Sequence, residues 1–160
     1  MTMSPVLLTH EGGQHFHMLN SLQTAKLTGE HTDGALSVVE FLGPRTFAPP
    51  LHMHDAEDEM FYILAGEVWL SCGDAEAVHG EGAVVWLPRG LPHTFQVRSQ
   101  TARVLTITTP AGFDRFVAAL GSPADSPVLP EPGPIDVGRV AEVCAEHNIQ
   151  VLGPPPEPLP

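Results

Sequence analysis

Two histidines separated by one residue, His52 and His54, begin the part of the sequence that is richest in metal-binding side chains. Alternate residues of a β-strand point to the same side of the sheet, so a His-x-His pair on a strand presents two imidazoles to one ion. Four acidic residues follow the pair: Asp55, Glu57, Asp58 and Glu59. Because neutral imidazoles and carboxylates suit divalent transition metals, this segment is a candidate metal site. A pair of surface or hydrogen-bonded histidines is the competing interpretation of the His-x-His motif taken alone.

A third histidine, His93, follows a strong turn signal later in the chain. The sequence from Gly82 to His93 reads GAVVWLPRGLPH. Pro88 and Gly90 are residues that build turns, so they should end a strand and redirect the chain. We expect this turn to aim a third imidazole toward the His-x-His pair.

Short runs of β-branched and aromatic residues, separated by Gly and Pro, fill the sequence from Leu36 to Thr109. They read LSVVEFL, EMFYILAG, EVWLSC, AVVWLP, TFQVRS and ARVLTITT. Several short strands at near-regular spacing, with turn residues between them, are typical of an antiparallel sandwich or barrel. The predicted fold class is therefore all-β.

Two short helices are predicted beyond these strands. Gly112–Leu120 carries apolar residues at helical spacing, and Gly121 follows as a stop. A second helix is predicted over Asp136–His147, with Asp136 as its N-cap. This second helix could close over the barrel mouth as a lid, or it could simply cover a face of the sheet.

The 160-residue chain is long enough to bury one core and short for two domains of ordinary size. We expect one domain in three parts: N-terminal strands and an irregular segment over residues 1–35, the barrel over 36–110, and helices with a Pro-rich tail over 111–160. The tail sequence GPPPEPLP should form neither helix nor ladder, because proline lacks the amide donor and fixes φ.

The charge balance is strongly acidic, with 7 Lys and Arg residues against 19 Asp and Glu residues and a net charge of −12. Such a surface repels phosphate backbones and anionic lipids, so we expect neither nucleic acid nor a membrane as partner. Cys72 and Cys144 lie far apart with no CxxC motif, which favours a reducing compartment. The N-terminus lacks the features of a secretory signal, and the expected location is the cytoplasm.

The order and spacing of the histidines and turn residues resemble the two-part signature of the cupin superfamily. That signature has a Gly, an HxH pair, a Glu and a Gly in its first part, and a Gly, a PxG turn and a His in its second. The matching positions here are Gly43, His52, His54, Glu59, Gly66, Gly82, Pro88, Gly90 and His93. Two departures are a longer gap between Gly43 and His52, and Val97 where the family often has Asn.

The resemblance implies a cupin fold, that is, a double-stranded β-helix or jelly-roll barrel with short C-terminal helices. It also implies one divalent transition metal ion, with Fe, Ni, Mn, Co, Cu and Zn all open as its identity. The implied ligands are His52, His54, Glu59 and His93. Six residues separate Glu59 from Gly66 in the signature, which selects Glu59 over the other acidic residues and leaves Glu57 as the second candidate. His15 and His17 form another HxH pair but are expected not to bind metal.

Residues beyond the signature resemble small single-domain bacterial cupins grouped with quercetin dioxygenases. This resemblance implies a metal-dependent dioxygenase acting on a small aromatic or enol substrate, with dioxygen as co-substrate and Glu59 as catalytic base. A lyase, isomerase or cyclase that uses the metal as a Lewis acid is the alternative enzyme, and a non-catalytic binding protein is the other alternative. Small cupins also pair their barrels, so we expect a homodimer.

Five further side chains surround the ligand segments in the sequence and are expected to line the substrate pocket. Core packing is the competing role for most of them. They are Met53, Phe47, Tyr62, Trp86 and Phe95.

Overall fold

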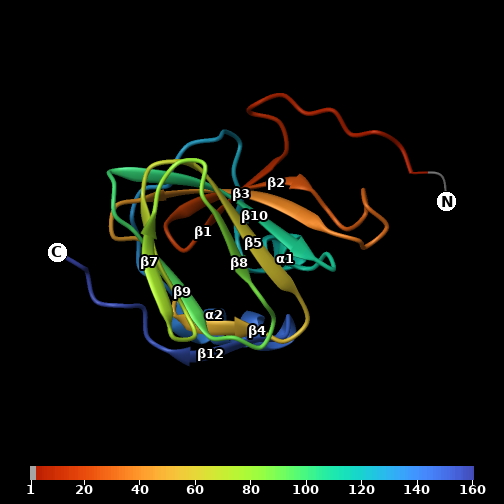
Figure 1. Ribbon diagram of the computed structural model, residues 1–160. Helices are drawn as coiled ribbons and strands as arrows, with labels where there is room; N and C mark the ends of the chain where they lie inside the picture. The colour runs from red at the N-terminus through yellow and green to blue at the C-terminus, as the bar shows by residue number, and fades with distance from the viewer. Residues whose placement is uncertain (1–2) are drawn as a thin grey trace.

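Strands dominate the computed structural model, which describes residues 3–160 (Figure 1). One group of strands comprises β1 (Gln14–Met18), β2 (Ser21–Leu27), β3 (Ser37–Pro44), β5 (Asp58–Ala65), β8 (Val84–Leu87), β10 (Thr101–Thr109) and β11 (Ser122–Pro123). The other comprises β4 (Leu51–His54), β6 (Val68–Cys72), β7 (Ala75–His79), β9 (His93–Val97) and β12 (Ile149–Gly153). The two helices are α1 (Phe113–Leu120) and α2 (Val137–Glu146).

These strands form two antiparallel sheets around a common interior (Figure 1). The seven-stranded sheet has the order β11-β1-β2-β3-β10-β5-β8, and the five-stranded sheet has the order β12-β4-β9-β6-β7. The all-β class with short C-terminal helices, predicted from the sequence, is confirmed. No helix within residues 3–160 has both the length and the apolar character needed to cross a membrane.

Side chains along the strands alternate between the interior of the barrel and its outer face. Along β3, Val39 and Phe41 are buried, whereas their neighbours are partly exposed. The same period of two runs along β10 and β5, where Val104 and Phe61 point inward. Each such apolar side chain stabilises the fold by about 1.5–3 kcal/mol when it is fully buried.

Both predicted helices are confirmed and pack on the core. In α1, Phe116 and Val117 are buried, and the Gly121 amide donates to the carbonyl of Val117. In α2, the side chain of Asp136 caps the helix by accepting from the amide of Arg139 at 3.0 Å. Buried residues of both helices join one core cluster with residues of β1 to β3, so α2 covers the barrel as a packed element.

β12 was not predicted from the sequence. It pairs antiparallel with β4, and its register places Ile149 opposite His54 and Val151 opposite His52. Asn148 separates α2 from this strand with a φ of 58°, a left-handed conformation that Asn tolerates better than most residues. The expectation that the tail from Gly153 onward forms no ladder was therefore wrong for its first residue, since Gly153 pairs with Leu51.

The remaining tail has no helix or strand, as expected, but it lies against the barrel. Proline lacks a donor but keeps its carbonyl acceptor, and the amide of Leu51 donates to the carbonyl of Pro154 at 3.4 Å. Farther along, the side-chain oxygen of Gln96 accepts from the amide of Leu159 at 2.9 Å. The tail thus runs along the sheet that carries the His-x-His pair.

Candidate metal centre

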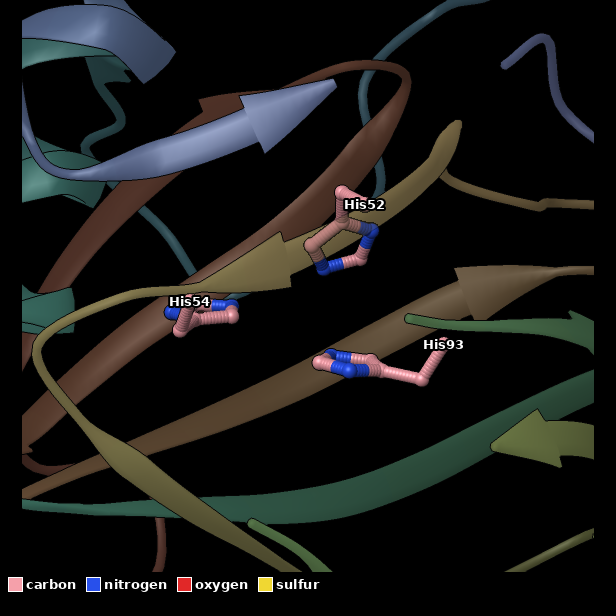
Figure 2. A group of neighbouring side chains, drawn as sticks. All are labelled: His52, His54 and His93. Carbon is pink, nitrogen blue, oxygen red and sulfur yellow. The ribbon is translucent and has the colours of Figure 1, made fainter. Parts of the chain in front are cut away.

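Three histidines meet between neighbouring strands of the five-stranded sheet. His52 and His54 lie on β4, and His93 lies at the start of β9, directly opposite His52 in the register. Figure 2 shows the three rings directed into the same space. One ring nitrogen from each lies within 4.8 Å of those of the other two. We call His52, His54 and His93 the histidine cluster.

The predicted turn before His93 is present and is tied to β4. Gly90 has a φ of 78°, in the left-handed region that glycine adopts without strain. Its amide donates to the carbonyl of His54 at 2.9 Å, which brings the end of the turn beside the His-x-His pair. The turn therefore positions His93 as the sequence predicted.

Hydrogen bonds at Nδ1 fix the orientation of all three rings. His52 Nδ1 donates to the carbonyl of Pro50 at 2.7 Å, and His93 Nδ1 donates to the carbonyl of Leu91 at 3.1 Å. His54 Nδ1 donates to Glu57 Oε2 at 3.0 Å. A neutral imidazole that donates at Nδ1 keeps a lone pair at Nε2, so each ring has its Nε2 free to bind metal.

Glu59 lies beside the histidine cluster. It projects inward from β5 and is 3% exposed. Its Oε2 lies 3.0 Å from His93 Nε2 and 3.6 Å from His54 Nε2. The structure thus brings Glu59 and the three histidines together, whereas Glu57 lies on the outer side of the His54 ring.

The residues at this centre fit a cation. His54 Nε2 is buried and has no hydrogen-bond partner among residues 3–160, although buried polar atoms are normally paired. Because His93 Nε2 and Glu59 Oε2 are both acceptors in the tautomer fixed at Nδ1, their 3.0 Å separation calls for a positive charge between them. Three imidazoles and a carboxylate are donors that a divalent transition metal binds.

The segment that carries the histidine cluster matches a known protein family. A family model described as the cupin domain matches residues 38–108, the segment that holds both parts of the signature. This chain therefore contains a segment that matches a cupin domain. It is a distant homologue of quercetin 2,3-dioxygenase of Bacillus subtilis, with 24% identity over 147 residues. That match covers 90% of this chain and 44% of the dioxygenase, so the chain spans less than half of its relative.

Solved structures of other proteins share the fold. KdgF from Halomonas sp. superposes with a TM-score of 0.55 and 14% identity, over 60% of this chain and 85% of that one. Bacillus subtilis oxalate decarboxylase, a protein described with Mn(II) centres, superposes with a TM-score of 0.57 and 20% identity, over 69% of this chain and 32% of that one. At these identities the likeness concerns the fold alone.

The surroundings of the site favour a neutral imidazole at His52 and an ionised carboxylate at Glu59. Burial, reinforced by His93 and His54, lowers the pKa of His52 to about 3. Burial alone would raise the pKa of Glu59, but His54 and His93 outweigh it and lower that pKa to about 2. Burial also works against the charged form of His54, yet Glu59 and Glu57 outweigh it and raise its pKa. The centre therefore attracts positive charge.

A cavity with aromatic walls adjoins the histidine cluster. His52, His54 and Glu59 form part of its lining. Two of the five side chains expected in a substrate pocket, Phe47 and Phe95, line it as well. The other lining aromatic residues, which the sequence did not indicate, are Phe41, Phe61, Phe113 and Phe116.

The other three side chains expected in the pocket lie elsewhere. Tyr62 is 38% exposed and Trp86 is 54% exposed, because alternation turns both to the outer face while their neighbours point inward. Met53 lies between the two histidines of β4, so alternation directs it to the other side of that strand, and it does not line the cavity. Sequence proximity to the ligands did not reveal which face each residue occupies.

Proposed function

We propose that this cupin holds one divalent transition metal ion on the histidine cluster and Glu59, and that it acts as a dioxygenase on a small aromatic or enol substrate. The observation that carries the proposal is the convergence of three imidazole nitrogens at the wall of an aromatic cavity, with His54 Nε2 buried and unpaired within residues 3–160. The distant relationship to quercetin 2,3-dioxygenase supports the reaction type.

The ion would supply Lewis acidity and open coordination positions for chemistry with dioxygen. The protein's own part begins with Glu59, whose ionised carboxylate is placed to accept the proton of a substrate hydroxyl at Oε2. Phe47 and Phe95 offer apolar ring surfaces on which an aromatic substrate can pack. The same surfaces exclude water from the reacting atoms.

The decisive experiment measures metal first and oxygen second. Protein purified without a chelating tag is analysed for elements, then assayed in an oxygen electrode with flavonols, catechols and enediols. We expect about one transition metal ion per chain and substrate-dependent oxygen uptake. Conversion of a substrate without oxygen uptake would instead support a Lewis-acid lyase, isomerase or cyclase, and bound ligand without conversion would support a binding protein. Metal-free protein that cannot be loaded would overturn the proposal.

Glu59→Gln separates binding from chemistry in the same assay. The amide keeps the size of the side chain but cannot take up the substrate proton. We expect oxygen uptake to fall by about 100-fold, in line with the loss of a general base. Metal analysis of the variant then shows how much of that loss is due to weaker metal binding.

We also propose that the protein forms a homodimer, as the resemblance to small cupins implies. β8 is an edge strand of the seven-stranded sheet, and edge strands favour pairing with another chain. Its outer face exposes Val84 and Trp86 opposite Tyr62 and Met60 of β5. A second copy covering this apolar face is the partner that the proposal names.

A further inference from the structure

One buried oxygen in the wall of the same cavity has no hydrogen-bond partner, and it belongs to Gln23. This residue of β2 is 3% exposed, and its Oε1 atom accepts from no group in residues 3–160. Gln23 lies opposite Phe41 in the register of β2 and β3, and both residues line the cavity. The side chain therefore faces the interior of the barrel.

Ser21 determines which end of the Gln23 amide faces the cavity. Ser21 Oγ donates its only proton to the carbonyl of Met18 at 2.6 Å. It can then only accept from Gln23, whose Nε2 lies 3.1 Å away. The amide nitrogen is thus held toward Ser21, and Oε1 is left as a fixed acceptor for something else.

Gln23 lies three strands away from Glu59 along the larger sheet. In the larger sheet, β2 is separated from β5, which carries Glu59, by β3 and β10. Three strand spacings amount to about 14 Å along the sheet. Phe41 on the intervening strand β3 and Phe61 on β5 also line the cavity. The lining of the cavity therefore combines the proposed metal-binding side chains, an apolar wall and a polar acceptor on a different strand.

We propose that Gln23 Oε1 accepts a hydrogen bond from a hydroxyl group of the substrate, and that Gln23 is a specificity-determining residue. The substrate class is an extended aromatic molecule with one oxygen function at the histidine cluster and a second hydroxyl remote from it. This inference rests on the proposed function and narrows its substrate. A substrate hydroxyl that pairs with this acceptor gains a hydrogen bond that an analogue without the distal hydroxyl lacks, so the analogue binds more weakly, by about tenfold.

The test compares matched ligands on the metal-loaded protein without oxygen. The probes are 3-hydroxyflavone and its derivatives with one added hydroxyl on either distal ring, and the measurement is calorimetric affinity. We expect one derivative to bind about tenfold more tightly than 3-hydroxyflavone. Gln23→Met, which keeps the length of the side chain, should abolish this preference and change the affinity for 3-hydroxyflavone by less than about twofold. Equal affinities of all three probes for the unaltered protein, or failure of all three to bind, would overturn the inference.

Two further variants keep the test independent of folding defects. Ser21→Ala leaves Gln23 in place but frees its amide to rotate, so the preference should shrink while the thermal unfolding transition persists. Thr24→Val removes a buried hydroxyl of the same strand that bonds to His15 outside the cavity, and it should retain the preference. If Thr24→Val lost the preference as Gln23→Met does, the assignment to Gln23 would be wrong.

Failure of this inference can be distinguished from failure of the proposed function. Affinities are measured without oxygen, whereas the dioxygenase proposal is tested by oxygen uptake. A preference that depends on Gln23, without oxygen uptake, would retain the inference and reject the dioxygenase. Oxygen uptake with equal affinities would do the reverse.

Discussion

His54 Nδ1 donates a hydrogen bond to Glu57 Oε2 over 3.0 Å, and both side chains are almost completely buried. The Glu57 carboxylate in turn lies against the start of α1, where a Cβ atom at Gly112 would collide with it. The positive end of a helix stabilises a negative charge there. Glu57, the second candidate for ligand in the sequence, thus holds the His54 ring from its Nδ1 side, away from the face where Glu59 approaches His54 Nε2.

Loss of the Glu57 charge should weaken metal binding. Carboxylates behind metal-bound histidines fix the ring and raise its basicity, and their removal costs about 10- to 100-fold in metal affinity. We expect Glu57→Gln to lie within that range when metal-free protein is titrated against a competing chelator. Asp55→Asn is the matched control, because Asp55 bonds to Gln150 in an exposed position. Equal affinities of Glu57→Gln and the unaltered protein would contradict this role.

His54→Ala should abolish stoichiometric metal binding but preserve the barrel. The two core clusters are built from apolar side chains of the strands and helices, and neither contains His54. Elemental analysis should show metal content lowered at least about tenfold, while thermal unfolding stays cooperative. His79→Ala, at a histidine outside the cluster, should keep its metal. A His54→Ala chain that still binds one ion would remove His54 from the ligand set.

Cys144 offers a reporter of the cavity. Its side chain lines the cavity wall, and burial raises the pKa of its thiol. A raised pKa means less thiolate at any given pH, so alkylation in a Cys72→Ala background should require a higher pH than for an ordinary thiol. Unfolding in urea should restore the ordinary pH profile. A folded-state profile that matches the unfolded one would contradict the burial of this thiol.

Trp86→Arg should dissociate the proposed homodimer. When two copies meet across this apolar face, the added charge of each arginine would have to be buried without a partner, which costs free energy of association. Light scattering should report a mass near 17.1 kDa for this variant and twice that mass for the unaltered protein. Val137→Arg, an exposed apolar position on α2, should remain dimeric. A monomeric unaltered protein would refute the pairing.

The sequence predicted those features that spacing encodes. Period-two patterns and turn residues located the strands, and the turn through Gly90 placed His93 beside the His-x-His pair. The sequence did not predict which face of the sheet each side chain of β5 and β8 occupies, because both faces of these strands carry apolar residues. Hydrophobicity alone then cannot say that Phe61 points inward and Tyr62 outward.

Contacts between residues far apart in the chain could not be predicted from the sequence either. Gln23 reads as an ordinary polar residue of a strand, and only the packed barrel places its oxygen in the wall of an apolar cavity. Ile149–Gly153 is a short segment directly after a helix, with no signal that names β4 as its partner. Both features depend on contacts between residues far apart in the chain.

The pairing of β12 with β4 sets an order of events during biosynthesis. His54 leaves the ribosome well before Ile149, the residue opposite it in the ladder. At about 5–20 residues per second, the strand with the His-x-His pair waits several seconds for this neighbour. Completion of the five-stranded sheet is therefore a late event, and a nascent chain stalled before Ile149 exposes an unpaired, histidine-bearing edge to chaperones and to other chains.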